Sequence, residues 1–241
     1  MGSDDQRWHR PRSYHHGNLK EVLLEAARKL IEQYGPAGFS LTEAARLAGV
    51  SPAAPYRHFR DRDALLAEVA RHGFERFAAR LDMAWNNGVP TPLSAFGNLG
   101  KAYLAFARSE PAFYSAMFES GLPVDLSPAL QAASERAFAV IRAAAERLAA
   151  LVPAGMPRPP AMMMALHIWS MSHGVASLFA RGDAARRKLP MSAEDLLEAE
   201  VLIYLRGLGF PTDRRPDGKD PAAKPSGPPP VPPAGPWGTP K

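Results

Sequence analysis

The chain has 241 residues, 46% of them hydrophobic, and no cysteine, so it can bury a core but excludes disulfide frameworks, thiolate metal sites and cysteine nucleophiles. Its formal net charge of +5 is unevenly distributed: residues 6–60 hold nine Lys and Arg against four Asp and Glu, whereas residues 81–210 hold eleven of each. A basic module joined to a neutral one indicates that the first meets a polyanion and that the second does something else.

The N-terminal stretch is polar throughout and contains no apolar segment that a secretion machinery could use. We therefore expect residues 1–17 to form a flexible basic arm and the protein to be cytoplasmic. From residue 19 to residue 34, apolar residues recur at steps of three and four, which predicts a first helix that Gly35 and Pro36 end.

Two short helices are predicted next, with a glycine-bearing turn between them. Thr42 and Glu43 open the segment LTEAARLAG, whose glycine suits a left-handed helix end. Ser51 then offers a hydroxyl cap and Pro52 takes the first position of a third helix running to about residue 59. A proline at position 55 deletes the first internal hydrogen bond, so an irregular start is expected.

This arrangement predicts a helix-turn-helix, in which the start of the second helix enters the major groove of DNA. Pro52, Ala53 and Ala54 carry no long side chain, so the backbone can approach base edges there. Tyr56, Arg57 and His58 follow where the helix would pass the sugar-phosphate wall, and their side chains can all bond phosphate oxygens. Alternatives stay open, because Tyr56 could be a core residue, His58 a surface histidine and Thr42 only a cap. Phe59 is expected in the core.

The runs YHHGNLKEVLLEAARKLIEQYG and GFSLTEAARLAGVSPAAPYRHFRDRDALLAEV resemble the DNA-binding domain of TetR-family transcriptional regulators. The resemblance implies a three-helix DNA-binding domain at residues 18–60, followed by a helical linking, ligand-binding and dimerisation domain at 61–210. It implies phosphate contacts by Thr42, Tyr56, His58 and Arg62. Base readout would fall to Pro52, Ala53 and Ala54, with Arg57 as a further candidate, and Ser51 is the remaining DNA-contact candidate.

The second part of the chain is predicted to be helical throughout, giving an all-α protein of about nine helices. The expected helices span residues 61–87, 93–109, 111–118, 128–151, 159–180 and 193–208, separated by Pro and Gly. Residues 161–180 carry no formal charge and are long enough to cross a bilayer, but their histidines and serines favour a helix buried in a core or subunit interface. Residues 211–241 hold eleven of the 25 prolines, which predicts a disordered tail.

The segment WSMSHG at residues 169–174 resembles the Trp and His-Gly feature of one TetR subgroup. Aromatic and methionine side chains suit an apolar cavity, although they also describe an ordinary core. The candidate ligand-binding residues are Phe96, Tyr103, Phe113, Met117, Trp169 and His173. The expected effector is a small hydrophobic or aromatic molecule.

Motifs for catalysis are missing from the sequence: it has no G-x-S-x-G turn, no H-E-x-x-H and no glycine-rich phosphate loop. His167 and His173 lie about 240° apart around a helix and cannot bind one metal from the same face. We therefore expect no enzyme, cofactor or metal. The resemblance favours a ligand-released repressor that binds a near-palindromic operator as a homodimer through residues 159–180 and 193–208. The alternatives are an architectural DNA-binding protein, or a helical interaction or enzyme domain whose helix-turn-helix is vestigial.

Overall fold

The computed structural model describes residues 19–179 and 189–211, and within these residues every regular element is helical. The eight α-helices are α1 (Leu19–Tyr34), α2 (Leu41–Leu47), α3 (Arg62–Trp85), α4 (Pro92–Ser109), α5 (Pro111–Phe118), α6 (Pro128–Ala149), α7 (Ala161–Phe179) and α9 (Ala193–Gly207). Three 3-10 turns join them: η1 (Pro55–Arg57), η2 (Asn86–Gly88) and η3 (Val124–Leu126). The all-α prediction is confirmed. The predicted basic arm, and the proline-rich tail beyond residue 211, lie outside the described residues.

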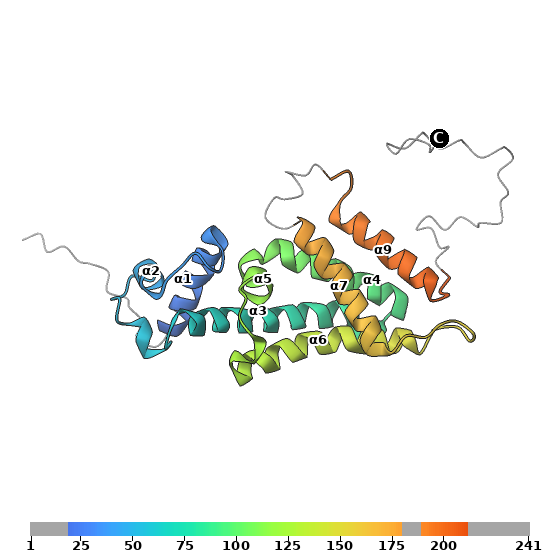
Figure 1. Cartoon of the computed structure of the whole chain (residues 1–241), viewed down its shortest axis with the longest axis horizontal. Coiled ribbons are helices and arrows are strands. Elements are labelled where there is room, and N and C mark those ends of the chain that lie inside the picture. Colours follow the sequence, from blue (N-terminus) through green and yellow to red (C-terminus); the bar gives the residue numbers. More distant parts are fainter. Residues whose placement is uncertain (1–18, 180–188, 212–241) are drawn as a thin grey trace, which may run out of the picture.

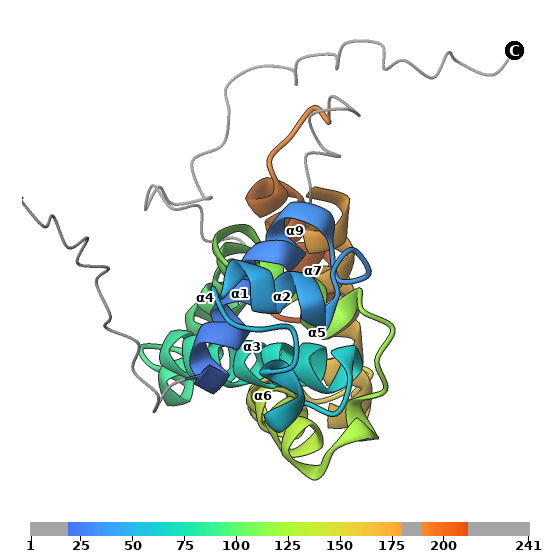
Figure 2. The same ribbon diagram turned by 90° about the vertical axis from the view of Figure 1, so that its left-hand side faces the viewer.

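The first unit is built from α1, α2, η1 and the start of α3, and it forms the end of the molecule that faces the viewer in Figure 2. The α1 helix buries the face that carries Leu23, Ala27 and Ile31. Ser40 caps α2: its hydroxyl accepts a hydrogen bond from the backbone of Glu43, whose carboxylate binds the backbone of Ser40 in return. The predicted segment does begin at Leu41, but the capping residue is Ser40 and not Thr42, which lies in the first turn.

The predicted third helix is a turn followed by the single 3-10 turn η1. Pro55 has no N–H to donate, which removes the bond that would close a first α-helical turn. The backbone amides of His58 and Phe59 both bond to the Pro55 carbonyl, each at 2.9 Å. Ser51 is not the cap either, because the N-cap of η1 is Ala54, which makes no side-chain hydrogen bond. The expected irregularity therefore extends to the whole element.

The long helix α3 joins the first unit to the second (Figure 1). Asp61 caps its start by accepting a hydrogen bond from the Ala64 backbone at 2.8 Å, and Asn86 ends it in a left-handed conformation with φ of 42°. Along its length α3 packs against α1, then α5, α6 and α4. A change in the tilt of α3 would therefore alter the packing of both units.

In the second unit α4 to α7 and α9 pack around α3 and share one hydrophobic core with it. The uncharged run of the sequence forms α7, which buries Met164, Ile168 and Val175 and exposes Met162 and Leu166 on the other side. Within residues 19–179 and 189–211, no helix has both the length and the hydropathy of a membrane span.

Candidate DNA interface and effector cavity

The turn between α2 and α3 presents the small residues and the polar residues of the first unit to solvent. Pro52, Ala53, Arg57 and His58 are exposed, and Tyr56 is 59% exposed. The alternative that Tyr56 belongs to the core is therefore wrong. The other candidates on this surface are Ser51, which is exposed, Ala54, which is half-buried, and Thr42, which is exposed in the first turn of α2.

Two buried residues hold this turn in place. Pro55 packs inward from η1, and Phe59, only 4% exposed, enters the core as the sequence predicted. Because these two side chains point inward, the residues between and before them point outward. Residues 51–54 therefore present only short side chains to solvent, whereas residues 56–58 present phenol, guanidinium and imidazole groups. Short side chains suit close approach to the bases in a DNA groove, and the polar groups suit the phosphates at its edge.

Arg62 has a different environment from the one that the resemblance implied. Its Nε donates to the Phe39 carbonyl at 3.1 Å, a second nitrogen donates to the Pro36 carbonyl, and a third contacts Asp63 at 2.7 Å. The guanidinium also lies 5.1 Å from the centre of the Phe39 ring. Arg62 therefore ties the start of α3 to the α1–α2 loop, and its donors are used inside the protein.

A cavity of about 820 Å³ lies in the second unit, between α4 and α9. Phe96 and Leu99 of α4 and Leu197 and Val201 of α9 line its sides. Its further apolar walls are Leu81 of α3, Ile141 of α6 and Ile168 of α7. The volume and the apolar lining are those of a site for a drug-sized molecule.

Of the six candidate ligand residues, only Phe96 and Tyr103 line this cavity. Phe113 instead lies under the guanidinium of Arg76, 5.3 Å from its ring centre, and Met117 packs against Gly73 of α3. These two side chains do not line the cavity; an aromatic or a methionine in a core has the same appearance in the sequence as one in a cavity wall. Their contacts place them between α5 and α3.

Trp169 and His173 belong to a hydrogen-bonded cluster behind Tyr103. The Tyr103 and Tyr114 hydroxyls lie 3.2 and 3.0 Å from Nδ1 of His173, and the Trp169 indole donates to the Tyr103 hydroxyl at 3.3 Å. Burial lowers the pKa of His173 below its usual value, which favours the neutral imidazole ring beside the two hydroxyl groups. Burial also raises the pKa of Tyr103 well above its usual value. The cluster therefore holds Tyr103 in a fixed, neutral position at the cavity wall.

Sequence reasoning missed Gly97, Gly100 and Ser172, which also line the cavity. A side chain at Gly97 would meet no other atom within 4 Å of its Cβ, whereas one at Gly100 would press on Leu197 at 3.1 Å. The available signal was a pair of glycines three residues apart in an otherwise apolar helix, which brings small residues to one face. Small residues on that face leave the space between α4 and α9.

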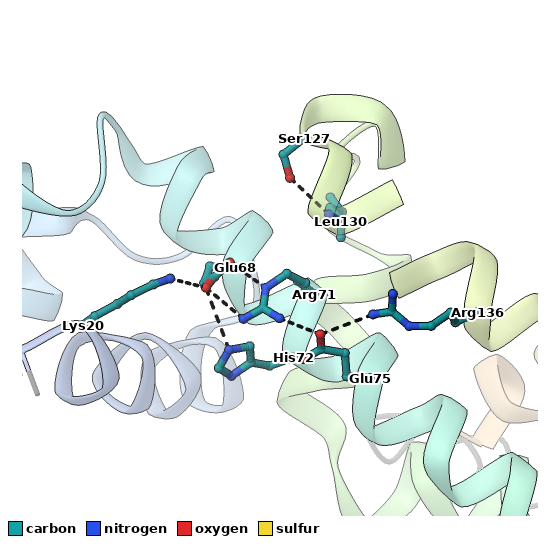
Figure 3. Close-up of polar contacts among 8 residues, drawn as sticks. All are labelled: Lys20, Glu68, Arg71, His72, Glu75, Ser127, Leu130 and Arg136. Atoms are coloured by element: carbon teal, nitrogen blue, oxygen red, sulfur yellow. Dashed lines mark hydrogen bonds and ion pairs between the residues drawn. The ribbon is translucent and has the colours of Figure 1, made fainter. Parts of the chain in front are cut away.

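A chain of ion pairs crosses from the first unit to the second along α3 (Figure 3). Glu68 receives hydrogen bonds from Arg71 at 2.8 and 2.9 Å and pairs with Lys20 of α1. Arg71 also binds Glu75 at 2.7 Å, and Arg136 of α6 lies 3.4 Å from Glu75. The bonds from Arg71, joined by that from Lys20, lower the pKa of Glu68 to about 2 in spite of its burial. The Glu68 carboxylate is thus held charged between α1 and α3, and Glu75 extends the chain of ion pairs to α6.

Taken together, a solvent-facing turn of small and cationic residues, a long connecting helix and a cavity-bearing helical unit define a class of protein: DNA-binding transcription regulators with a separate effector unit. Two family models match the chain. Residues 23–69 match the model of bacterial regulatory proteins of the tetR family, and residues 96–203 match a tetracyclin repressor-like C-terminal domain. The chain belongs to the TetR family of transcriptional regulators.

Solved structures agree with this assignment. A protein of unknown function from a Rhodococcus species is 31% identical, with a TM-score of 0.68 over 83% of this chain and 100% of its own. The TetR-family transcriptional regulator PfmR from Thermus thermophilus is 24% identical, with a TM-score of 0.59 over 77% of this chain and 98% of its own, a likeness that concerns the fold. No curated protein matches the sequence.

Proposed function

We propose that this chain is a repressor that binds a near-palindromic operator as a homodimer and leaves it when a small apolar effector enters the cavity. We further propose that it acts in the cytoplasm and without catalysis or cofactor. The observation that carries the proposal is the joining of the exposed turn at residues 51–58 to the α4–α9 cavity through the single helix α3. Coupling between DNA binding and effector binding requires an element that contacts both sites, and α3 is such an element.

For the DNA contacts, exposure supports a division of roles along the turn. Ser51, Pro52, Ala53 and Ala54 approach the base edges, where short side chains allow close contact with thymine methyls. Thr42, Tyr56, Arg57 and His58 bind phosphate oxygens on either side. We assign Arg62 a structural role in place of the phosphate contact, since two backbone carbonyls already accept from it.

An exposed stripe on α7 supports pairing with a second copy. Met162, Leu166 and Leu178 are between 41% and 47% exposed, and together they lie on the solvent-exposed side of α7, opposite the buried Met164, Ile168 and Val175. Gly174 lies on the same face, where the lack of a side chain permits close approach of another helix. On α9, Ile203 is 70% exposed. An apolar face of this kind, on two neighbouring helices, fits a self-complementary interface.

In the dimer two turns would meet DNA about one helical turn apart, roughly 34 Å, or a multiple of it. An effector that prefers a conformation with another spacing lowers operator affinity by its difference in affinity between the two states. The cavity wall includes Leu81, on the same helix whose start positions the DNA-reading turn. A shift of α3 at Leu81 would therefore change the position of the turn.

The first experiment is selection of random duplex DNA by the purified protein, followed by sequencing of the retained fraction. A near-palindromic consensus is expected, and it supplies a probe for measuring release by effectors. Retention without a consensus, with a steep salt dependence, would support an architectural protein instead. No retention at moderate salt would overturn DNA binding altogether.

The dimer is tested by Leu166→Asp in sedimentation equilibrium, with Leu126→Asp as the matched control. Leu166 is 46% exposed on the α7 stripe, and Leu126 is 41% exposed in η3. The first variant is expected to be monomeric and the second dimeric, because only the first places a charge in the paired face. A dimer that survives Leu166→Asp would place the interface elsewhere.

A further inference from the structure

We infer that the effector of this protein is an uncharged molecule with an apolar body and one hydroxyl or carbonyl group that hydrogen-bonds to Ser172. This inference rests on the proposed function, whose effector it specifies. It depends on where the polar and charged side chains of the cavity lie, on which of them already have partners, and on the space left beside Gly97.

Among residues 19–179 and 189–211, none offers an ionic partner for a charged ligand inside the cavity. The charged residues that line it are Lys101, Glu194 and Glu198. Lys101 and Glu198 are exposed to solvent, and Glu194 is bound to Arg108 at 2.6 Å across the α4–α9 boundary. These groups form a rim. Behind them the wall consists of leucine, isoleucine, valine and phenylalanine side chains, among which an unpaired charge would be expensive to bury.

Among the described residues, the buried hydroxyl groups of the cavity wall are those of Tyr103 and Ser172, whereas Thr91 and Ser94 line its exposed edge and are bonded to each other. Tyr103 is 2% exposed and its hydroxyl already contacts both Trp169 and His173. Ser172 is 4% exposed and lines the same cavity. Its hydroxyl makes no hydrogen bond to the part of the chain that the structure describes. A buried hydroxyl beside an apolar cavity gains a bond when a ligand supplies the partner.

The chemistry of serine limits what that partner is. A hydroxyl group donates one hydrogen bond and accepts two, so an alcohol, ketone, ester or amide satisfies it without a charge. A carboxylate could accept from Ser172 as well, but it would lose its water in exchange for one neutral donor. An ammonium group would meet the same loss. The site therefore favours the neutral member of any series that shares one apolar body.

The test uses the full chain and compares ligands that share one ten-carbon chain and differ in the head group, which is neutral, anionic or cationic. The fluorescent probe N-phenyl-1-naphthylamine is displaced with 1-decanol, decanoate or decylammonium at neutral pH. Decanol is expected to displace the probe at a concentration lower by about ten-fold or more, since an unpaired buried charge costs well over one power of ten. Equal or better displacement by decanoate or by decylammonium would overturn the inference.

Two variants locate the binding. Ser172→Ala is expected to weaken decanol about five-fold, the effect of one neutral hydrogen bond. Ser170→Ala, whose hydroxyl bonds to the His167 carbonyl away from the cavity, is the matched control and should leave decanol binding unchanged. Gly97→Leu places a side chain in the open space of the cavity and should abolish displacement. Unchanged decanol binding in both Ser172→Ala and Gly97→Leu would exclude this site.

The inference and the proposed function fail in different ways. If operator selection yields a palindrome but no neutral ligand binds the cavity, the effector inference is wrong and the DNA-binding proposal stands. If decanol binds as expected and no DNA is retained, the proposed function is wrong while the cavity chemistry holds. Release of the operator probe by decanol, lost in Gly97→Leu, would support both.

Discussion

The turn that we propose reads DNA and the cavity that we propose binds an effector are built in opposite ways. The turn uses eight consecutive residues, 51–58, whereas the cavity takes its walls from five helices between residues 81 and 211. In the turn, position in the chain almost determines exposure, because Pro55 and Phe59 point inward and their neighbours must point outward. In the cavity, exposure depends on how helices pack. The exposure of residues in a short turn can therefore be predicted from the sequence, whereas the residues that line a cavity between helices cannot.

The largest expected effect comes from a charge placed on the turn. Ala53→Asp should lower operator affinity by about a hundred-fold or more, because a carboxylate would face bases and phosphates without a partner. The residue is exposed, so the helix content in circular dichroism should not change. Ala154→Asp, at an exposed loop position, adds the same charge far from the turn and is the control. Loss of helix content in Ala53→Asp would mean that the residue supports the fold.

A second prediction concerns Arg62, for which sequence and structure disagree. Arg62→Gln should lower the free energy of unfolding by about 2 kcal/mol, because two carbonyls and an aromatic ring lose their partner. Urea denaturation measures this effect.

Arg57→Gln is the comparison for Arg62, because Arg57 is exposed. It should leave stability unchanged and reduce the slope of log affinity against log salt by about one. If Arg62→Gln reduced the salt slope and Arg57→Gln reduced the stability, the phosphate role that the resemblance implied for Arg62 would be right.

The ion-pair chain between the two units gives a smaller, pH-dependent effect. Glu68→Gln should lower the free energy of unfolding at neutral pH by about 1 kcal/mol, within the range of partly exposed charge networks. The folded-state pKa of Glu68 is lowered from 4.5 to about 2, so its stabilisation is present above about 4.5 and is lost as pH falls towards 2. Wild type and variant should therefore converge at low pH.

Denaturation midpoints across this pH range test that prediction, with Glu146→Gln as the control. Glu146 is in an exposed pair within α6, 3.7 Å from Arg142. A difference that stays constant with pH would mean that Glu68 acts through packing and not through its charge.

The smallest effect is expected for one hydroxyl on the turn. Tyr56→Phe should weaken binding to all DNA sequences alike, by about five-fold, because a phosphate contact carries no sequence information. Tyr34→Phe is a matched control, since Tyr34 is also 59% exposed but lies at the end of α1. Weakening confined to the selected consensus would make Tyr56 a base-reading residue.

Sequence reasoning predicted most helices of the described residues to within a few positions, because their apolar periodicity and their Pro and Gly breaks are local signals. It predicted the burial of Phe59 for the same reason. It was wrong on the third helix, where two prolines outweighed the helical spacing, and on the α2 cap, where Ser40 takes the place predicted for Thr42. For Phe113, Met117, Trp169 and His173 it could not separate core from cavity, because both environments select apolar and aromatic side chains.

By itself the sequence determined the helical class, the family resemblance and the order of small and cationic residues on the turn, since each depends on neighbours along the chain. Only the tertiary structure decided that Arg62 binds carbonyls, that Tyr103 is held by Trp169 and His173, and that Gly97 and Ser172 meet at one cavity. These depend on contacts between helices distant in sequence, and such contacts are fixed by packing geometry, which periodicity does not contain.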